Sequence, residues 1–150
     1  MTNAFSIVQD GAIARLTLTR PERANALGSA FWRDFPAAID ALNQAGQTRV
    51  LLIESEGRHF CSGMDTDAFT SLGKSDSAHD RFQFRANLLV LQETLTKLEQ
   101  ANFAVVAAIQ GACLGGGLDL VLACDIRVCS ENASFGIEET NIAIVADLGS

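Results

Sequence analysis

Apolar residues follow two different periods along the chain, and these periods predict strands and helices in turn. Near the start they recur at about every second position, over Phe5 to Gln9 and again over Ile13 to Thr19. This alternation is typical of half-buried strands, and Asp10-Gly11 between the two runs is a hairpin signal. The chain is therefore predicted to open with a β-hairpin.

Two later segments show the helical period of three to four residues. The apolar face of the first consists of Phe31, Phe35, Ile39 and Leu42. Ser29 is its predicted N-cap, and Pro36 inside it is expected to kink or divide the helix because proline has no backbone N–H. A second helix is predicted over Phe82 to Ala101 after a polar connection, Ser71 to Asp80, which is expected to be mobile. Its apolar face consists of Leu88, Leu91, Leu95 and Leu98.

Continuous apolar runs predict strands over Val50 to Ile53 and Val105 to Ile109. Two further short strands are predicted over Ile126 to Cys129 and Ala133 to Gly136, on either side of the turn Glu131-Asn132. The run from Val50 to Ile53 has no polar position, so it is expected to be buried on both faces. The order of hairpin, helix, strand, helix, strand, helix and strand predicts an α/β fold built from two-strand-plus-helix units. No second domain boundary is visible, so one domain is expected over residues 1–150.

Composition and charge change this picture by excluding classes of partner. Hydrophobic residues make up 48% and charged residues 19% of the 150 positions, and the formal net charge is −7. An acidic chain lacks the basic surface that nucleic acids and anionic membranes attract, so neither is expected as a partner. Neither a signal peptide nor an apolar run of membrane-spanning length is present, so a cytoplasmic location is expected.

The cysteines and histidines do not predict a metal site or a disulfide framework. The four cysteines are Cys61, Cys113, Cys124 and Cys129. No Cys-x-x-Cys pair occurs, and His59 and His79 do not have the spacing of metal ligands. The cysteines are therefore expected to be small buried residues.

The stretch from Ile109 to Arg127 carries the first chemical signal. Three glycines, Gly115 to Gly117, follow an apolar run and precede a second apolar segment, Leu118 to Ala123, which contains one acid, Asp119. A strand that passes through glycines into a helix leaves backbone N–H groups free at the helix start, where the dipole favours negative charge. The alternative is that these glycines only allow a strand and a helix to pack closely.

Three motifs in a fixed order carry a resemblance to a known family. They are RPERANAL at 20–27, FCSGMD at 60–65 and GACLGGGLDLVLACDIR at 111–127. Together they resemble the crotonase (enoyl-CoA hydratase/isomerase) superfamily. The resemblance implies a spiral of repeated ββα units and assembly into a trimer or a dimer of trimers. It also implies a C-terminal helical part that is missing here, so residues 1–150 would be the N-terminal core domain of a longer chain.

The same resemblance assigns residues to an acyl-CoA site. The backbone N–H groups of Met64 and Gly116 would hold the thioester oxygen, because two such donors stabilise a developing enolate. Coenzyme A would be part of the substrate, with no separate cofactor and no metal. The CoA-binding residues implied by the motifs are Arg23, Ala24, Ala26, Leu27, Ser62, Gly63 and Asp65. Arg20 is a second candidate for the nucleotide phosphates, although either arginine could equally be an ordinary solvated side chain.

Three acids distinguish the reaction within the family. Asp119, Glu139 and Asp147 together match the pattern of the Δ3,5-Δ2,4-dienoyl-CoA isomerase branch of fatty acid β-oxidation. A 1,5-proton shift removes a proton at C2 and returns one at C6, which is too far for one base. Glu139 is assigned as the base at C2 and Asp147 as the acid at C6, with Asp119 between them. In isolation, Asp119 could instead be a helix-dipole partner and Asp147 a turn cap.

Two other functions remain open at this point. The first is hydration of a 2-enoyl-CoA, or another acyl-CoA reaction of the superfamily, although Asp119 is shorter than the glutamate that the hydratase branch carries there. The second is a non-catalytic acyl-CoA-binding protein, since a fold does not fix a function. The retained acids argue against a pure binder, because placing carboxylates beside an acyl chain is costly.

Overall fold

Two β-sheets form the framework of the structure, a computed structural model that describes residues 4–68, 77–142 and 144–149. The strands of the large sheet are, in spatial order, β1 (Phe5–Asp10), β2 (Ile13–Leu18), β3 (Val50–Ser55), β4 (Ala104–Ile109) and β6 (Ile126–Cys129). Strands β1 and β2 form the predicted antiparallel hairpin, and every later pairing is parallel. The small sheet pairs β5 (Ala112–Leu114) with β7 (Ser134–Gly136).

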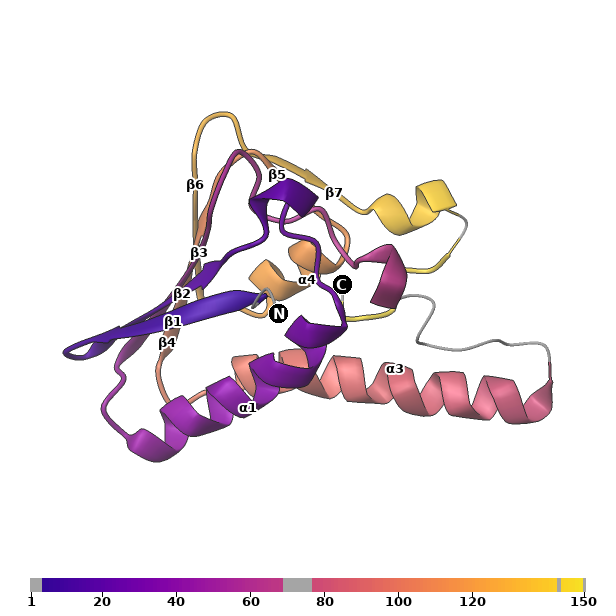
Figure 1. The fold of residues 1–150 in the computed structure, drawn as a ribbon, viewed down its shortest axis with the longest axis horizontal. Coiled ribbons are helices and arrows are strands. Elements are labelled where there is room, and N and C mark those ends of the chain that lie inside the picture. Colours follow the sequence, from indigo (N-terminus) through magenta and orange to yellow (C-terminus); the bar gives the residue numbers. More distant parts are fainter. Residues whose placement is uncertain (1–3, 69–76, 143, 150) are drawn as a thin grey trace.

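The chain forms a spiral in which strands of the large sheet alternate with short extended segments and helices (Figure 1). The helices are α1 (Ser29–Ala45), α3 (Ala78–Glu99) and α4 (Gly116–Leu122), and the 3-10 segments are η1 (Pro21–Arg23) and η2 (Glu138–Ile142). Parallel bridges join successive turns, between Leu27 and Met64 and between Cys61 and Cys113. Cys113 is in turn paired with Phe135 in the small sheet. This repeat of strand, short strand and helix confirms the predicted ββα spiral.

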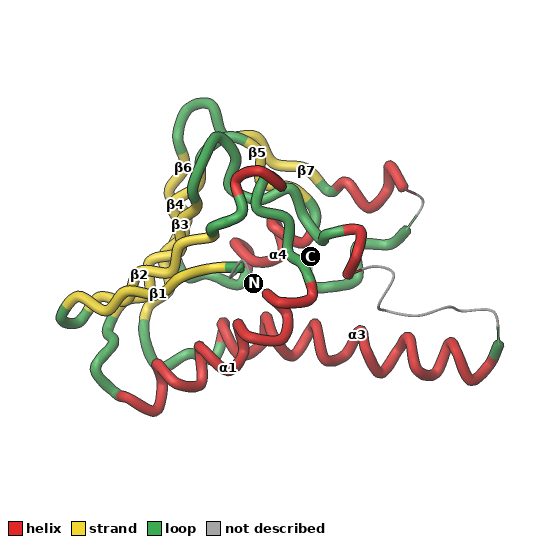
Figure 2. The backbone as a smooth tube through the Cα atoms, viewed as in Figure 1, coloured by secondary structure: helices red, strands yellow, loops and turns green. Residues whose placement is uncertain are grey.

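The core lies on one face of the large sheet, under α1 and α3 (Figure 2). Leu16, Leu51 and Val105 point from three adjacent strands into one cluster with the predicted apolar faces of both helices. The prediction that Val50 to Ile53 is buried on both faces is wrong. In β3 only alternate residues are fully buried, and Leu52 is partly exposed because no described element covers the other face of the sheet.

Helix α1 starts one residue earlier than predicted. Gly28, which is extended at φ −85° and ψ 179°, is the N-cap, and Ser29 is already helical. The helix also runs through Pro36 as one element, so it is not divided. Phe35 and Ile39, on either side of the proline in the sequence, are both fully buried. Their packing compensates for the backbone hydrogen bond that Pro36 cannot donate.

Helix α3 begins earlier than its apolar period indicates. Ser77 caps it in a reciprocal capping box with Asp80, so Ala78 to Asp80 are helical rather than part of the predicted connection. Residues 69–76 of that connection lie outside the described residues. Leu95 and Leu98 are buried as predicted, whereas Leu88 and Leu91 are only partly buried. No helix in the described part of the chain is long and apolar enough to cross a membrane.

The two faces of β3 provide a test of this core. Leu51→Ala is expected to lower the free energy of unfolding by about 2–5 kcal/mol, because it leaves a cavity where the side chain is 0% exposed. Leu52→Ala removes the same atoms from the partly exposed face and should cost less than half as much. Denaturant unfolding of both variants measures the difference, and equal losses would contradict the one-sided core.

Candidate active site

The glycine turn between β5 and α4 brings two spiral turns into close contact. Gly115 is the N-cap at φ +49°, a conformation that other residues rarely adopt. A Cβ added at Gly117 would lie 2.7 Å from the Cβ of Cys61, a distance that real Cβ atoms do not tolerate. Close packing is therefore one function of these glycines. Close packing does not exclude a role in binding an anion, because the same packing positions the backbone N–H groups.

The backbone N–H groups of Met64 and Gly116 lie near each other on adjacent turns. A Cβ on Gly116 would be 3.6 Å from Met64 N, and a Cβ on Gly63 would be 3.6 Å from Gly116 N. Among the residues that the structure describes, neither amide donates a hydrogen bond. The neighbouring amides do, from Leu27 to Gly63 O at 2.8 Å and from Asp65 to Leu27 O at 3.0 Å. Two free donors thus lie side by side in an otherwise bonded backbone.

Glu139 and Asp147 line one apolar cavity of about 120 Å³ beside these amides. The other lining residues are Met64, Phe84, Leu88, Ile144 and Leu148. The Glu139 carboxylate lies close to the glycine turn, since a Cβ on Gly115 would be 2.8 Å from Glu139 Oε1. Burial raises the pKa of the Asp147 carboxyl above its ordinary value, which makes its protonated form easier to keep.

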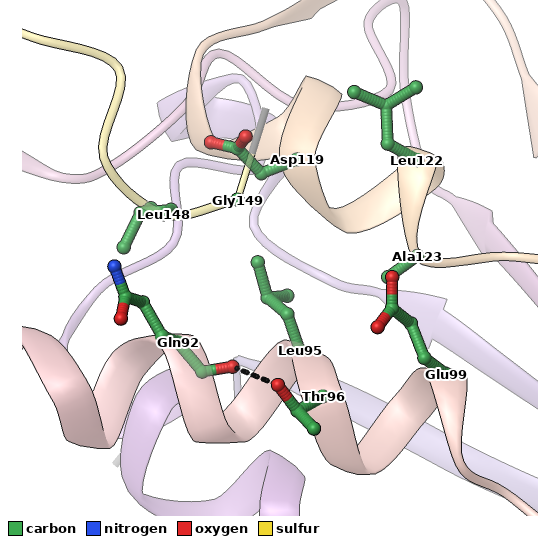
Figure 3. Close-up of a pocket in the computed structure, with 9 residues that line it drawn as sticks. All are labelled: Gln92, Leu95, Thr96, Glu99, Asp119, Leu122, Ala123, Leu148 and Gly149. Carbon is green, nitrogen blue, oxygen red and sulfur yellow. Dashed lines mark hydrogen bonds between the residues drawn. The ribbon is translucent and has the colours of Figure 1, made fainter.

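Asp119 is buried in a neighbouring pocket rather than in this cavity. It projects from α4, and α3 contributes Gln92 and Glu99 to the lining of the same pocket (Figure 3). The segment carrying Leu148 and Gly149 passes between α4 and α3 (Figure 3), and Leu148 lines both the pocket and the cavity. Leu148 is therefore shared by the pocket of Asp119 and the cavity of the other two predicted acids.

Two of the residues predicted to bind CoA, Arg23 and Asp65, are bonded to each other. Asp65 is 3% exposed and accepts from Arg20 Nη2 at 2.9 Å and from Arg23 Nη2 at 3.1 Å. Burial by itself would raise the pKa of Asp65, but hydrogen bonds from Arg20, the Asp67 amide and Arg23 outweigh it and lower that pKa. Arg23 is half-exposed, so one face of its guanidinium remains accessible beside the ion pair.

The predicted CoA-binding residues of segments 23–27 and 62–65 are together called the strap here. The main chain of this strap is largely occupied by internal hydrogen bonds. The N–H groups of Ala24, Ala26 and Leu27 donate to Pro21 O, Arg23 O and Gly63 O. Ser62 N donates to Ala24 O at 2.9 Å, and its side chain is exposed. Contact with a ligand through this strap would therefore use carbonyl lone pairs and side chains, and its role in CoA binding stays a prediction.

Asn25 is a structural residue of the strap that motif reasoning did not single out. Its side chain donates to Glu56 O at 2.8 Å and to His59 O at 2.9 Å, and it accepts from Arg20 N at 2.9 Å. Asn25 and the preceding Ala24 both have positive φ, at 55° and 46°. An asparagine in the middle of a turn motif is the available sequence signal, because it adopts this conformation more readily than other non-glycine residues.

The cysteines are structural in three of four cases. Cys61, Cys113 and Cys124 are buried, and burial raises the pKa of each thiol to about 12. Cys129 is exposed on the edge strand β6, contrary to the expectation that all four are buried. Within the described ranges, no group of three or more histidine, cysteine or acidic side chains is arranged to hold a metal ion.

Comparison with known proteins identifies the family. The model of the Enoyl-CoA hydratase/isomerase family matches residues 9–150. The chain belongs to this family. It is 43% identical over 145 residues to a peroxisomal Delta(3,5)-Delta(2,4)-dienoyl-CoA isomerase of Arabidopsis thaliana, a match that covers 93% of this chain and 52% of the relative. It is also 37% identical over 146 residues to a probable enoyl-CoA hydratase of Bacillus subtilis, covering 95% and 53%.

Solved structures support the same fold. A putative enoyl-CoA hydratase from Thermobifida fusca, crystallised in complex with acetoacetyl-CoA, superposes with a TM-score of 0.84 at 31% identity. That match covers 97% of this chain and 58% of the solved one. The chain thus spans about half the length of the curated relatives it matches.

The lowered pKa of Asp65 predicts an acid-dependent loss of stability. A depressed pKa contributes stability that is present above the unfolded value, about 3.9, and is lost as the pH falls through the folded value. Asp65→Asn should lower the free energy of unfolding by about 1–3 kcal/mol at pH 7, because two buried charge-assisted hydrogen bonds are weakened. The difference from wild type should shrink below pH 4 in denaturant titrations. Asp10→Asn, at an exposed strand end, is the control and should change little.

The raised pKa of Asp147 predicts the opposite dependence. A raised pKa contributes stability that is complete below the unfolded value and is lost as the pH rises through the folded value. Asp147→Asn, which stays neutral, should therefore make the protein more stable than wild type at pH 7. The two proteins should have equal stability near pH 3 in the same titrations. A less stable Asp147→Asn at pH 7 would contradict a pKa raised by burial.

Proposed function

We propose that the full-length protein is a dienoyl-CoA isomerase, which moves the double bonds of a 3,5-dienoyl-CoA thioester into conjugation with the carbonyl. The observation that carries this proposal is the pair of acids, Glu139 and Asp147, in one apolar cavity beside two free backbone N–H groups. An apolar cavity suits an acyl chain, and two acids suit a reaction in which a proton leaves one carbon and another arrives elsewhere.

The free amides of Met64 and Gly116 would hold the thioester oxygen. Loss of a proton at C2 moves negative charge onto this oxygen, and two preorganised donors stabilise that charge more than they stabilise the neutral carbonyl. Their proximity to Glu139 supports this role, because the oxygen and C2 are neighbours in the thioester. The glycine at position 116 leaves space for the ligand to approach the backbone.

Proton transfer would then proceed in two steps. Glu139, as a carboxylate, takes the proton from C2, and the electron pair delocalises through C3 to C6 of the dienolate. Asp147, as a carboxylic acid, gives its proton to C6, which leaves double bonds at C2 and C4. The raised pKa of Asp147 supports its assignment as the acid. After the reaction Glu139 is protonated and Asp147 is ionised. Proton transfer through solvent restores the starting state.

The remaining predicted residues would serve binding. Arg23 is a candidate contact for the nucleotide phosphates of CoA through its accessible face, with Ala24, Ala26, Leu27, Ser62 and Gly63 shaping the strap. Asp65 would act indirectly by orienting both arginines. Asp119 would influence the cavity through Leu148 rather than by touching the reacting carbons. Assembly into trimers and a location in the cytoplasm remain predictions, and the Arabidopsis relative is named as peroxisomal.

Hydration of a 2-enoyl-CoA is the second candidate, favoured by the identity to the Bacillus subtilis relative. A hydratase holds a water molecule between two acids that reach the same pair of carbons. Here the buried Asp119 and the cavity acid Glu139 line two separate pockets. This separation favours the isomerase.

The proposal predicts a specific pattern of activity in the full-length protein. A 3,5-dienoyl-CoA should be converted to the conjugated 2,4-isomer, which is followed by its ultraviolet absorbance. Glu139→Gln and Asp147→Asn should each lower kcat by roughly 10²–10⁴-fold, the range for loss of a general acid or base. Glu138→Gln, the exposed neighbour of Glu139, is the matched control and should keep wild-type activity.

Two results would redirect this assignment. Crotonyl-CoA hydration at an enzymatic rate, without dienoyl-CoA isomerisation, would make the protein a hydratase. Tight binding of acyl-CoA with no turnover of either substrate, unchanged by the Glu139 and Asp147 substitutions, would identify a binding protein.

A further inference from the structure

A side chain of α3 is bonded to the segment that carries Asp147. Gln92 Nε2 donates to the main-chain oxygen of Asp147 at 2.6 Å, and joins positions 55 residues apart. We propose that Gln92 is a positioning residue, which fixes the main chain from which the Asp147 carboxylate enters the cavity. This inference rests on the proposed isomerase function and adds to it a residue that does not contact the reacting atoms.

The segment around Asp147 has few other supports. Residues 144–149 contain no helix or strand, and Ile144 and Val145 are exposed. Leu148, at 6% exposure, is the apolar anchor: its Cδ1 would lie 3.4 Å from a Cβ on Gly116. The Gln92 hydrogen bond holds the peptide unit between Asp147 and Leu148, and the Leu148 side chain anchors the residue that follows it. Without the hydrogen bond, the apolar contact would leave this peptide free to rotate.

The donor itself comes from a rigid part of the structure. Gln92 lies in the middle of α3, one helical turn before Thr96, whose hydroxyl donates to Gln92 O at 3.1 Å (Figure 3). Leu95 and Leu98 bury the same region of the helix in the core. Lys97 joins it to α1 through Asp40. A side chain held in this way can fix residues 144–149, which contain no helix or strand, relative to the core.

The hydrogen bond affects only one of the two proton transfers. Removal of the C2 proton depends on Glu139 and the two backbone amides, none of which Gln92 contacts. Delivery of a proton to C6 depends on Asp147, and a misplacement of about 1 Å at a catalytic group can lower a rate by roughly 10²-fold. Loss of the Gln92 amide should therefore slow the second transfer selectively. General damage to the fold would slow both.

The test compares two substitutions in the full-length protein. Gln92→Met keeps the length of the side chain but removes the donor. Gln83→Met makes the same change at an exposed position on the same helix and is the matched control. Each protein is incubated with a 3,5-dienoyl-CoA in D2O. Isomerisation is followed by absorbance, and deuterium incorporation at C2 of the unreacted substrate by mass spectrometry.

The expected result is at least a tenfold lower kcat for isomerisation in Gln92→Met, with KM and the C2 exchange rate within about twofold of wild type. Gln83→Met should match wild type in all three. Equal losses of isomerisation and exchange in Gln92→Met, or no loss of either, would overturn the proposal.

A further measurement separates this inference from the proposed function. If the wild-type protein neither isomerises nor exchanges, the isomerase assignment fails, and amide hydrogen exchange over residues 144–149 decides the role of Gln92. Faster exchange in Gln92→Met than in Gln83→Met would support the anchoring of this segment, whereas equal rates would overturn it.

Discussion

The close approach of successive spiral turns is the constraint on which the candidate site depends. Gly117 packs against Cys61 at a distance that leaves no space for a Cβ, and Cys61 is bridged to Cys113 on the same turn as Gly117. This packing brings the free amides of Met64 and Gly116 together. A larger residue at either contact position would separate the turns and the two donors with them. The need for small side chains accounts for the buried cysteines at these two positions.

Local pattern was enough to predict most elements of the fold. The strands and helices follow from apolar periodicity because each element buries one face, and the period of that face is set by its own backbone. The errors lie where capping or the cover of a sheet face decides, and not the hydrophobic period. Ser77 starts α3 through a cap with Asp80, and β3 is open on one side because no described element covers Leu52. Neither property is encoded in the hydrophobic period of the segment concerned.

The site was predicted at the level of motifs but not of side-chain contacts. The glycine turn could be found from its composition, whereas the acids Glu139 and Asp147 were assigned from the resemblance of their segments to the family's motifs. The ion pair of Arg20 with Asp65 and the hydrogen bond of Gln92 with Asp147 join residues 45 and 55 positions apart. Such contacts depend on the path of the whole chain, so a polar residue such as Gln92 is indistinguishable in sequence from a solvated one.

Asp65 and Asp147 are both held by hydrogen bonds, but their pKa values shift in opposite directions. Asp65 is held by arginine donors on its carboxylate, which stabilise the ionised form and lower its pKa. Asp147 is held by a donor on its main-chain carbonyl, and burial then raises the pKa of its carboxyl. A further donor on the Asp147 carboxylate would favour the ionised form, as the hydrogen bond from its own backbone amide already does in part. Anchoring through the main-chain oxygen therefore leaves the raised pKa of this carboxyl in place, which under the proposed function suits an acid that protonates a distant carbon.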